Sequence, residues 1–249
     1  MLNISIKAEP IAEFFGFPIT NSLLTSFIVL AILVAVSLYY QKQLERKKKS
    51  RIFYLMQYVI RAIYRTFESI NKEKINTLFP LVGAFFFFIL FQNWFGLLPG
   101  VGSILVPEAE HGAGEAGKTM IPLLRGGNAD LNTTLVLGIV AVIAIQYYGI
   151  KYLGLKGYIS KYINFKDPIN FFLGLLEIVS EFSRVLSFSF RLFGNVFAGE
   201  VVLLVIAFLI PVLASFPFFI MEIFVGFIQA LVFSMLVSVF LQIATAKSH

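Results

Sequence analysis

The sequence contains no cysteine and only two histidines, His111 and His249. The absence of cysteine excludes a disulfide framework, a thiol nucleophile and a thiolate metal site. Two histidines so far apart do not make a histidine metal cluster, so we predict no metal site and no cofactor. The sequence also lacks a phosphate-binding loop of the GxxxxGK(S/T) kind. The chain is therefore not expected to be an enzyme on its own.

Charged residues are scarce as well. They make up 14% of the chain, against ~25% in ordinary soluble domains, while 58% of the residues are apolar. Several apolar runs exceed the ~20 residues that a membrane-spanning helix needs. We therefore predict an all-α polytopic membrane protein in the lipid bilayer. Residues 1–19 do not have the basic and apolar regions of a signal peptide, so the first span is expected to be retained.

The apolar runs predict about five spanning helices within a single membrane domain, residues 1–249. The run at 52–74 alternates apolar and charged residues, which is typical of an amphipathic helix on a membrane surface. Residues 99–130 are rich in glycine and predict a loop outside the membrane. The predicted spans are 20–41, 75–98, 131–152, 170–210 and 216–245.

The last two segments are too long for upright helices. About 40 residues over 170–210 would make a helix of ~60 Å, and about 30 residues over 216–245 one of ~45 Å, against a hydrocarbon core of ~30 Å. Pro211 and Pro217 mark a turn between them. We therefore predict a hairpin of two strongly tilted helices, with a tilt near ~50° for the second if it is confined to the core.

Positive charge is distributed unevenly between the two sides of this arrangement. Fifteen Lys and Arg residues lie in 42–74, in 151–167 and at Lys247, and three lie on the other side. The positive-inside rule predicts an N-terminus outside and a C-terminus in the cytoplasm. The basic run at 42–51 adjoins a span, which favours a membrane flank over a nucleic-acid site. The lysine-rich run favours a bacterial plasma membrane over a mitochondrial inner membrane.

The stretch 183–200, SRVLSFSFRLFGNVFAGE, places charges in an otherwise apolar segment. A guanidinium in mid-membrane costs at least ~2.5–3.5 kcal/mol, so Arg191 is a functional candidate by default. On a helix, small and polar residues lie within about 60° of Arg191, among them Asn195. This face predicts a groove for a partner helix, because small side chains allow close approach. Glu200 points to the opposite face.

A second set of polar residues lies on the last long helix. Glu222 and Gln229 share one face. Gln229 either forms a hydrogen bond that joins two helices or takes part in the proton path, and the sequence leaves both roles open. Glu200 and Glu222 flank the predicted turn at similar distances, so both should lie in the outer half of the membrane. Two such carboxylates can share and pass a proton.

Nearer the cytoplasmic side, Glu177, Glu181 and Arg184 are spaced four and three residues apart. Such spacing places them on one helix face. These charged residues can have a structural role, as an ion pair between Glu181 and Arg184. They can also have a functional role, as the lining of a cytoplasmic half-channel, and the two roles are compatible.

Three segments carry a family resemblance: AEPIAEFFGFPIT at 8–20, ADLNTT at 129–134 and RLFGNVFAGE at 191–200. They resemble subunit a, the membrane stator proton channel of F-type ATP synthases. The resemblance implies that Arg191 is the essential charge facing a rotor carboxylate and that Asn195 and Gln229 continue the outer half-channel. It also implies that the hairpin faces the c-subunit ring, with b subunits of the peripheral stalk and the rest of the complex as partners. Many members have histidine in the position of Glu222.

The resemblance implies a function in which proton flow through two offset half-channels drives rotation and ATP synthesis, with Arg191 preventing bypass. The alternative is a proton-coupled secondary transporter. Such transporters usually contain internal repeats. The pattern at 183–200 has no second copy in the sequence.

Overall fold

The computed structural model describes residues 8–14, 17–98, 100–107, 120–162, 168–210 and 215–246. Five of its helices are long and apolar enough to cross a membrane, which confirms the predicted all-α polytopic membrane fold. They are α1 (Asn21–Glu45), α3 (Ile75–Gly96), α4 (Leu131–Tyr162), α5 (Pro168–Leu209) and α6 (Ser215–Thr245). The shorter α2 (Arg51–Asn71) corresponds to the predicted amphipathic helix.

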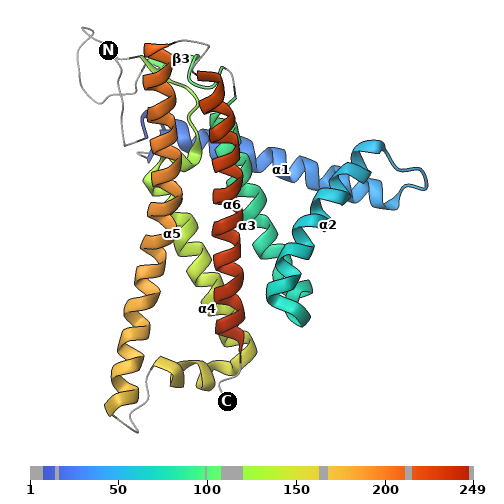
Figure 1. The fold of residues 1–249 in the computed structure, drawn as a ribbon, viewed down its shortest axis with the longest axis vertical. Helices are drawn as coiled ribbons and strands as arrows, with labels where there is room; N and C mark the ends of the chain where they lie inside the picture. The colour runs from blue at the N-terminus through green and yellow to red at the C-terminus, as the bar shows by residue number, and fades with distance from the viewer. Residues whose placement is uncertain are drawn as a thin grey trace.

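The two longest helices form the spine of the molecule. In Figure 1, α5 and α6 run side by side along the long axis, and α1 runs crosswise to them. If α1 stands upright in a membrane, α5 and α6 must therefore be strongly tilted. Pro217 lies in the first turn of α6, where proline is tolerated, while Pro211 lies outside the described residues.

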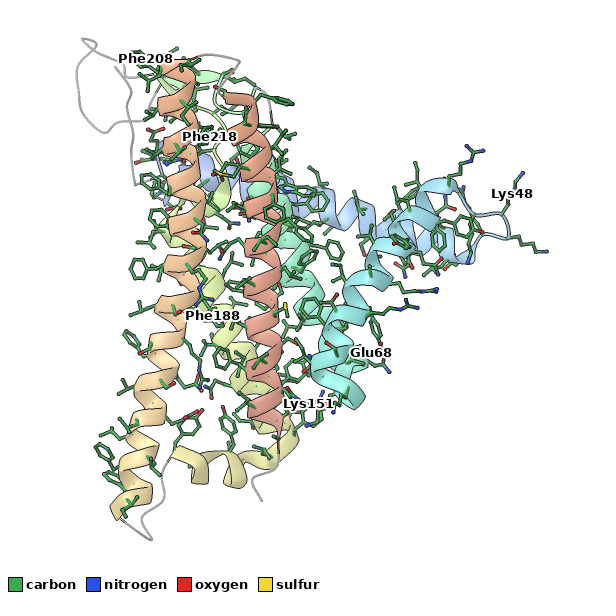
Figure 2. The ribbon with its side chains drawn as sticks, viewed as in Figure 1. Lys48, Glu68, Lys151, Phe188, Phe208 and Phe218 are labelled. Atoms are coloured by element: carbon green, nitrogen blue, oxygen red, sulfur yellow. The ribbon has the colours of Figure 1, made fainter. Side chains whose placement is uncertain are left out.

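The core lies where α3, α4, α5 and α6 meet. Phe188 of α5 packs against Phe233 of α6 with ring centroids 4.9 Å apart, and Phe85 of α3 stands 5.6 Å from the same ring. Figure 2 shows the Phe188 side chain midway along the α5–α6 pair. Removing a buried phenylalanine of this kind costs ~3–5 kcal/mol, so these contacts hold the hairpin to the rest of the bundle.

The helices α1 and α2 form an arm that extends away from the spine, with Lys48 near its tip (Figure 2). Tyr40 stacks on Phe53 at 4.9 Å where the two helices meet. The far end of α2 returns to α6, where Asn71 Nδ2 donates a hydrogen bond to Ser238 Oγ. The 3-10 turn η1 (Lys72–Lys74) follows. The Lys74 ammonium donates to the Thr245 carbonyl at 2.7 Å.

Helix α4 continues past its predicted end at residue 152 to Tyr162, and it bends at Gly154. Gly154 has φ 76°, a left-handed conformation that glycine adopts without strain. The bend turns Tyr158 back onto α4, where Gly149 leaves room for its ring because it has no Cβ. The Tyr158 hydroxyl donates to Gln146 Oε1 at 2.5 Å. The bend at Gly154 explains why the helix extends beyond the predicted end of the span and packs against its own earlier turns.

The segment before α1 and the outer loop each contain a pair of short strands that the sequence analysis did not predict. Two antiparallel pairs, β1 (Pro10–Phe14) with β2 (Phe17–Thr20) and β3 (Leu105–Pro107) with β4 (Met120–Pro122), lie at the same end as the starts of α1 and α4. The 3-10 turn η2 (Gly127–Ala129) follows β4. Residues 99 and 108–119 of the predicted outer loop lie outside the described residues.

Buried polar contacts fix this loop over the bundle. Ser22 Oγ of α1 donates to Asp130 Oδ2 at 3.1 Å, and Asp130 Oδ1 accepts from the Asn132 amide at 3.1 Å. Asp130 therefore caps α4. Asn21 Nδ2 also donates to the Pro122 carbonyl at 3.2 Å. These contacts determine where residues 123–129 sit above the site.

Candidate functional site

A cavity of about 440 Å³ opens between α5, α6, the end of α3 and the outer loop. Its apolar wall comes mainly from α5 and α6. Its polar and charged side chains come from five different segments of the chain, and they are Glu9, Asn93, Arg125, Asn195, Glu200, Glu222 and Gln229. All four residues that the sequence predicts for the outer half-channel therefore line one cavity.

Glu200 is held by a cation from the outer loop. Arg125 Nη2 lies 3.0 Å from Glu200 Oε2, and Arg125 Nε donates to Glu200 Oε1 at 3.2 Å. The Arg125 side chain is 8% exposed and that of Glu200 35%. Two nitrogens of one guanidinium on one carboxylate make a bidentate pair, the strongest geometry for this contact. The backbone amide of Arg125 also donates to Thr25 Oγ1 at 3.3 Å, which fixes the loop to α1.

Glu222 projects from α6 against the backbone of α5. Its carboxylate lies so close to Gly199 that a Cβ at position 199 would collide with it. Among the described residues, the Glu222 side chain has no hydrogen bond and no ion pair. Neighbouring α6 backbone is fixed by α3, since Asn93 Nδ2 donates to the Gly226 carbonyl at 2.9 Å and Trp94 Nε1 to the Ile223 carbonyl at 3.0 Å.

The sequence analysis treated Glu200 and Glu222 as two carboxylates that can share and pass a proton. In the structure Glu200 pairs with Arg125, and the interactions of the described residues include no hydrogen bond between the two carboxylates. Arg125 lies 75 residues from Glu200 in the chain, on a loop whose path the sequence does not specify.

Asn195 and Gln229 connect α5 and α6 at the inner end of the cavity. Asn195 Nδ2 donates to Gln229 Oε1 at 2.6 Å, and Gln229 is 4% exposed. The Gln229 Nε2 atom is buried without a partner in the described part of the chain. Gln229 therefore joins the two helices and retains a donor that can hydrogen-bond to water.

Arg191 does not line the cavity. It lies on the exposed side of α5, where its guanidinium donates to Ser187 Oγ at 3.4 Å. Gly194 and Ala198 are exposed on the same side, and nothing lies within 4 Å of where a Gly194 Cβ would be. The face predicted as a groove for a partner helix is thus open.

Glu177, Glu181 and Arg184 form a cluster that contains the predicted ion pair between Glu181 and Arg184. Arg184 Nη1 lies 2.6 Å from Glu181 Oε1, and Arg184 Nη2 lies 3.3 Å from Glu177 Oε1. The guanidinium also lies over the Phe240 ring, 4.4 Å from its centroid, which adds a cation–π contact. Arg184 therefore contacts Glu177 and Glu181 on its own helix and Phe240 on α6.

Two tyrosines extend this cluster from the end of α4. The Tyr162 hydroxyl donates to Glu181 Oε1 at 3.2 Å and lies 2.9 Å from the Tyr158 hydroxyl. Burial raises the pKa of Tyr158 and of Tyr162 above their ordinary value, so both phenols remain protonated donors at neutral pH. One Glu181 oxygen stays buried without a partner among the described residues. The cluster can hold charge and hydrogen bonds together near the membrane surface.

Comparison with known families decides between the two functions that the sequence left open. The model of the family described as ATP synthase A chain matches residues 23–242. The chain belongs to this family. ATP synthase subunit a of Gloeobacter violaceus (strain ATCC 29082 / PCC 7421) is 32% identical to it over 221 residues, which cover 87% of this chain and 80% of that protein.

Membership of the family confirms the resemblance that residues 191–200 carry and overrides the alternative of a secondary transporter. The chain is a non-catalytic membrane subunit of the F-type ATP synthase, concerned with proton translocation. The two half-channels and the roles of single residues are separate questions.

The close contact at Gly199 makes a testable prediction. Gly199→Ala should displace the Glu222 carboxylate and lower proton flux, because overpacking at a helix contact costs ~1–3 kcal/mol or moves the side chain. Gly83→Ala in α3 is the control, since its Cβ would meet only ordinary contacts, 3.5 Å from Phe79. Proton flux per assembled complex measures both. Equal flux in the two variants would contradict the assigned position of Glu222.

Proposed function

We propose that this chain is the stator proton channel of a rotary F-type ATP synthase, with two offset half-channels at its interface with the c-subunit ring. The observation that carries the proposal is the separation of charges. Glu200, Glu222 and Gln229 line a cavity on one side of α5, whereas Arg191 stands on the exposed side outside that cavity. A path for protons and a fixed positive charge at its end are the two components that such a channel requires.

The outer half-channel consists of the cavity. A proton entering from outside reaches the Glu222 carboxyl group, passes the Asn195–Gln229 contact and protonates a carboxylate on a rotor helix. The neutral carboxyl group then moves with the ring through lipid, where an ionised one would be costly. Each proton released at the far side has been carried by the rotor, not through the stator.

Arg191 ends the cycle. A rotor carboxyl group that approaches the exposed guanidinium gives up its proton, because an adjacent cation stabilises the ionised carboxylate. The same cation repels protons and so blocks direct passage between the half-channels. One charge moving through 100 mV is worth ~2.3 kcal/mol, so a leak here would dissipate the gradient that drives rotation.

The inner half-channel is assigned to the cytoplasmic cluster of Glu177, Glu181 and Arg184. Their salt bridges do not compete with this role, since a lined path needs fixed charges and hydrogen-bond partners. The distribution of basic residues supports an N-terminus outside and a C-terminus in the cytoplasm of a bacterial plasma membrane. The b subunits of the peripheral stalk would then hold this chain against rotation.

Crosslinking within the whole complex tests which face meets the rotor. The chain contains no cysteine, so Ser187→Cys and Ala198→Cys introduce single reactive sites on the Arg191 face. Both should crosslink to a cysteine placed beside the rotor carboxylate, because α5 must pass close to that helix. Leu204→Cys lines the cavity and is the control that should not crosslink. Crosslinks from Leu204→Cys alone would mean that the rotor side is assigned backwards.

The tilt of the hairpin is open to a direct measurement. We expect α5 and α6 to lie far from the ~20° average tilt of spanning helices, because each exceeds the ~30 Å core by a wide margin. Spin labels along α6, placed in bilayers with a depth-dependent quencher, report the depth of each position. A depth change of about 1.5 Å per residue would indicate an upright helix and contradict the expectation.

A further inference from the structure

We propose that Arg125 is a positioning residue for the outer half-channel, and that by pairing with Glu200 it leaves Glu222 as the carboxylate that transfers the proton. This inference rests on the proposed function and divides the labour between two carboxylates that the sequence alone treats as equivalent. The geometry points to it because α5 and α6 each contribute one acid to the cavity, Glu200 and Glu222, and the guanidinium lies at hydrogen-bond distance from Glu200.

The position of Arg125 makes it more than a surface cation. Its side chain is 8% exposed, and its backbone is tied to Thr25 of α1. It comes from the loop between β4 and η2, which the contacts of Asn21 and Asp130 hold over the bundle. A charge delivered on so well-anchored a loop is positioned before any proton arrives, which is the requirement for a preorganised site.

Four charged groups face the cavity from the described residues: Glu9, Arg125, Glu200 and Glu222. Glu9 Oε2 accepts a hydrogen bond from Asn21 Nδ2 at 3.3 Å, at the outer end of the site. Glu200 receives two nitrogens of Arg125, so its charge is balanced locally. The Glu222 carboxylate lies against Gly199, and Gly199 is the residue directly before Glu200 in the chain. The guanidinium therefore keeps the second negative charge from competing with Glu222 for the same proton.

The pairing also sets the net charge of the cavity. With Arg125 and Glu200 balancing each other, gain and loss of one proton at Glu222 changes the cavity by one unit. Without the guanidinium, two unbalanced carboxylates would share protons as a coupled pair and hold one of them more tightly. Without Glu200, the guanidinium would face the cavity without this carboxylate and would disfavour the incoming proton at Glu222. Either single loss should therefore slow transfer, and loss of both should be milder.

The test measures ATP-driven proton pumping per assembled complex in inverted membrane vesicles. Arg125→Gln should lower pumping about tenfold, because removing one member of a buried charge pair leaves the other uncompensated. Arg125→Lys keeps the charge but not the fork, and should pump within about threefold of the unchanged protein. The double variant Arg125→Gln with Glu200→Gln should pump faster than either single variant, which independent sites would not do.

Arg65→Gln, on the exposed side of α2, is the matched control for removal of an arginine and should pump normally. The proposal is overturned if the double variant does not pump faster than both single variants, or if Arg125→Lys pumps no better than Arg125→Gln in an equally assembled complex. If Arg125→Gln fails to assemble, the double variant is compared with Glu200→Gln alone. Equal or lower pumping by the double variant then overturns the proposal, and faster pumping supports it.

The proposed function and this inference fail in different ways. Pumping that survives Arg191→Ala and Glu222→Gln would overturn the proposed channel, whatever Arg125 does. Pumping that requires Arg191 and Glu222, with additive losses at Arg125 and Glu200, would overturn only the division of labour between the two carboxylates.

Discussion

Arg191→Ala should reduce ATP-driven proton pumping to the background of vesicles without the complex, while the complex still assembles. The guanidinium lies on an exposed face of α5, outside the core, so its loss removes no packed contact. Without the cation, a rotor carboxyl group has nothing to displace its proton at the boundary between the half-channels. Quenching of a pH-sensitive dye in inverted vesicles, with ATP hydrolysis measured in parallel, tests the expectation.

The control for this variant is Arg65→Ala, which removes an exposed arginine from α2, far from the hairpin in the sequence. It should pump at the rate of the unchanged protein. Arg191→Lys separates charge from shape, because an ammonium keeps the charge but lacks the planar fork. Near-normal pumping by Arg191→Ala in an assembled complex would remove the charge barrier from the mechanism.

Glu222→Gln should have the second largest effect, lowering proton flux about a hundredfold, which is typical for loss of a positioned acid or base. The substitution keeps the size of the side chain, so the contact with Gly199 and the cavity should be preserved. What it removes is a group that can gain and lose a proton. Passive proton flux through vesicles stripped of the catalytic head isolates this step from ATP chemistry.

Glu177→Gln is the matched control for a glutamate lost from the long hairpin. Glu177 forms an ion pair with Arg184, and Glu181 contacts the same guanidinium at a shorter distance. Because Glu181 remains in Glu177→Gln, this variant should lower proton flux only mildly. The ratio of the two fluxes is the informative quantity. Flux in Glu222→Gln as high as in Glu177→Gln, with both near the rate of the unchanged protein, would mean that the outer path is not where the cavity lies.

The membrane fold could be predicted from the sequence because its signal is local. Runs of apolar residues longer than a bilayer is thick identify five helices without any knowledge of packing. Local signals fail where geometry depends on one residue in a special conformation. The bend at Gly154 lets α4 continue to Tyr162. The apolar run predicted over 131–152 does not reveal this continuation.

The site was predictable only in part, for the same reason. Arg191, Glu200 and Glu222 stand out because charges in apolar helices are rare, and helical spacing puts them on definite faces. Arg125 lies in a polar loop, where one more cation is unremarkable. It reaches Glu200 through contacts of Asn21 and Asp130 that join segments about a hundred residues apart, as in the Ser22–Asp130 bond with a separation of 108. Sequence periodicity carries no information about such contacts.

The open face around Arg191 has a consequence for how the complex is built. An exposed guanidinium in lipid costs at least ~2.5–3.5 kcal/mol, and a carboxylate on a partner helix relieves that cost. Docking of the rotor and stability of this chain are therefore thermodynamically linked through the residue that also drives the proton cycle. A chain inserted without its partner carries the full penalty, in a membrane where degradation acts on the least stable form. Assembly in the right order is thus favoured by the same charge that turnover requires.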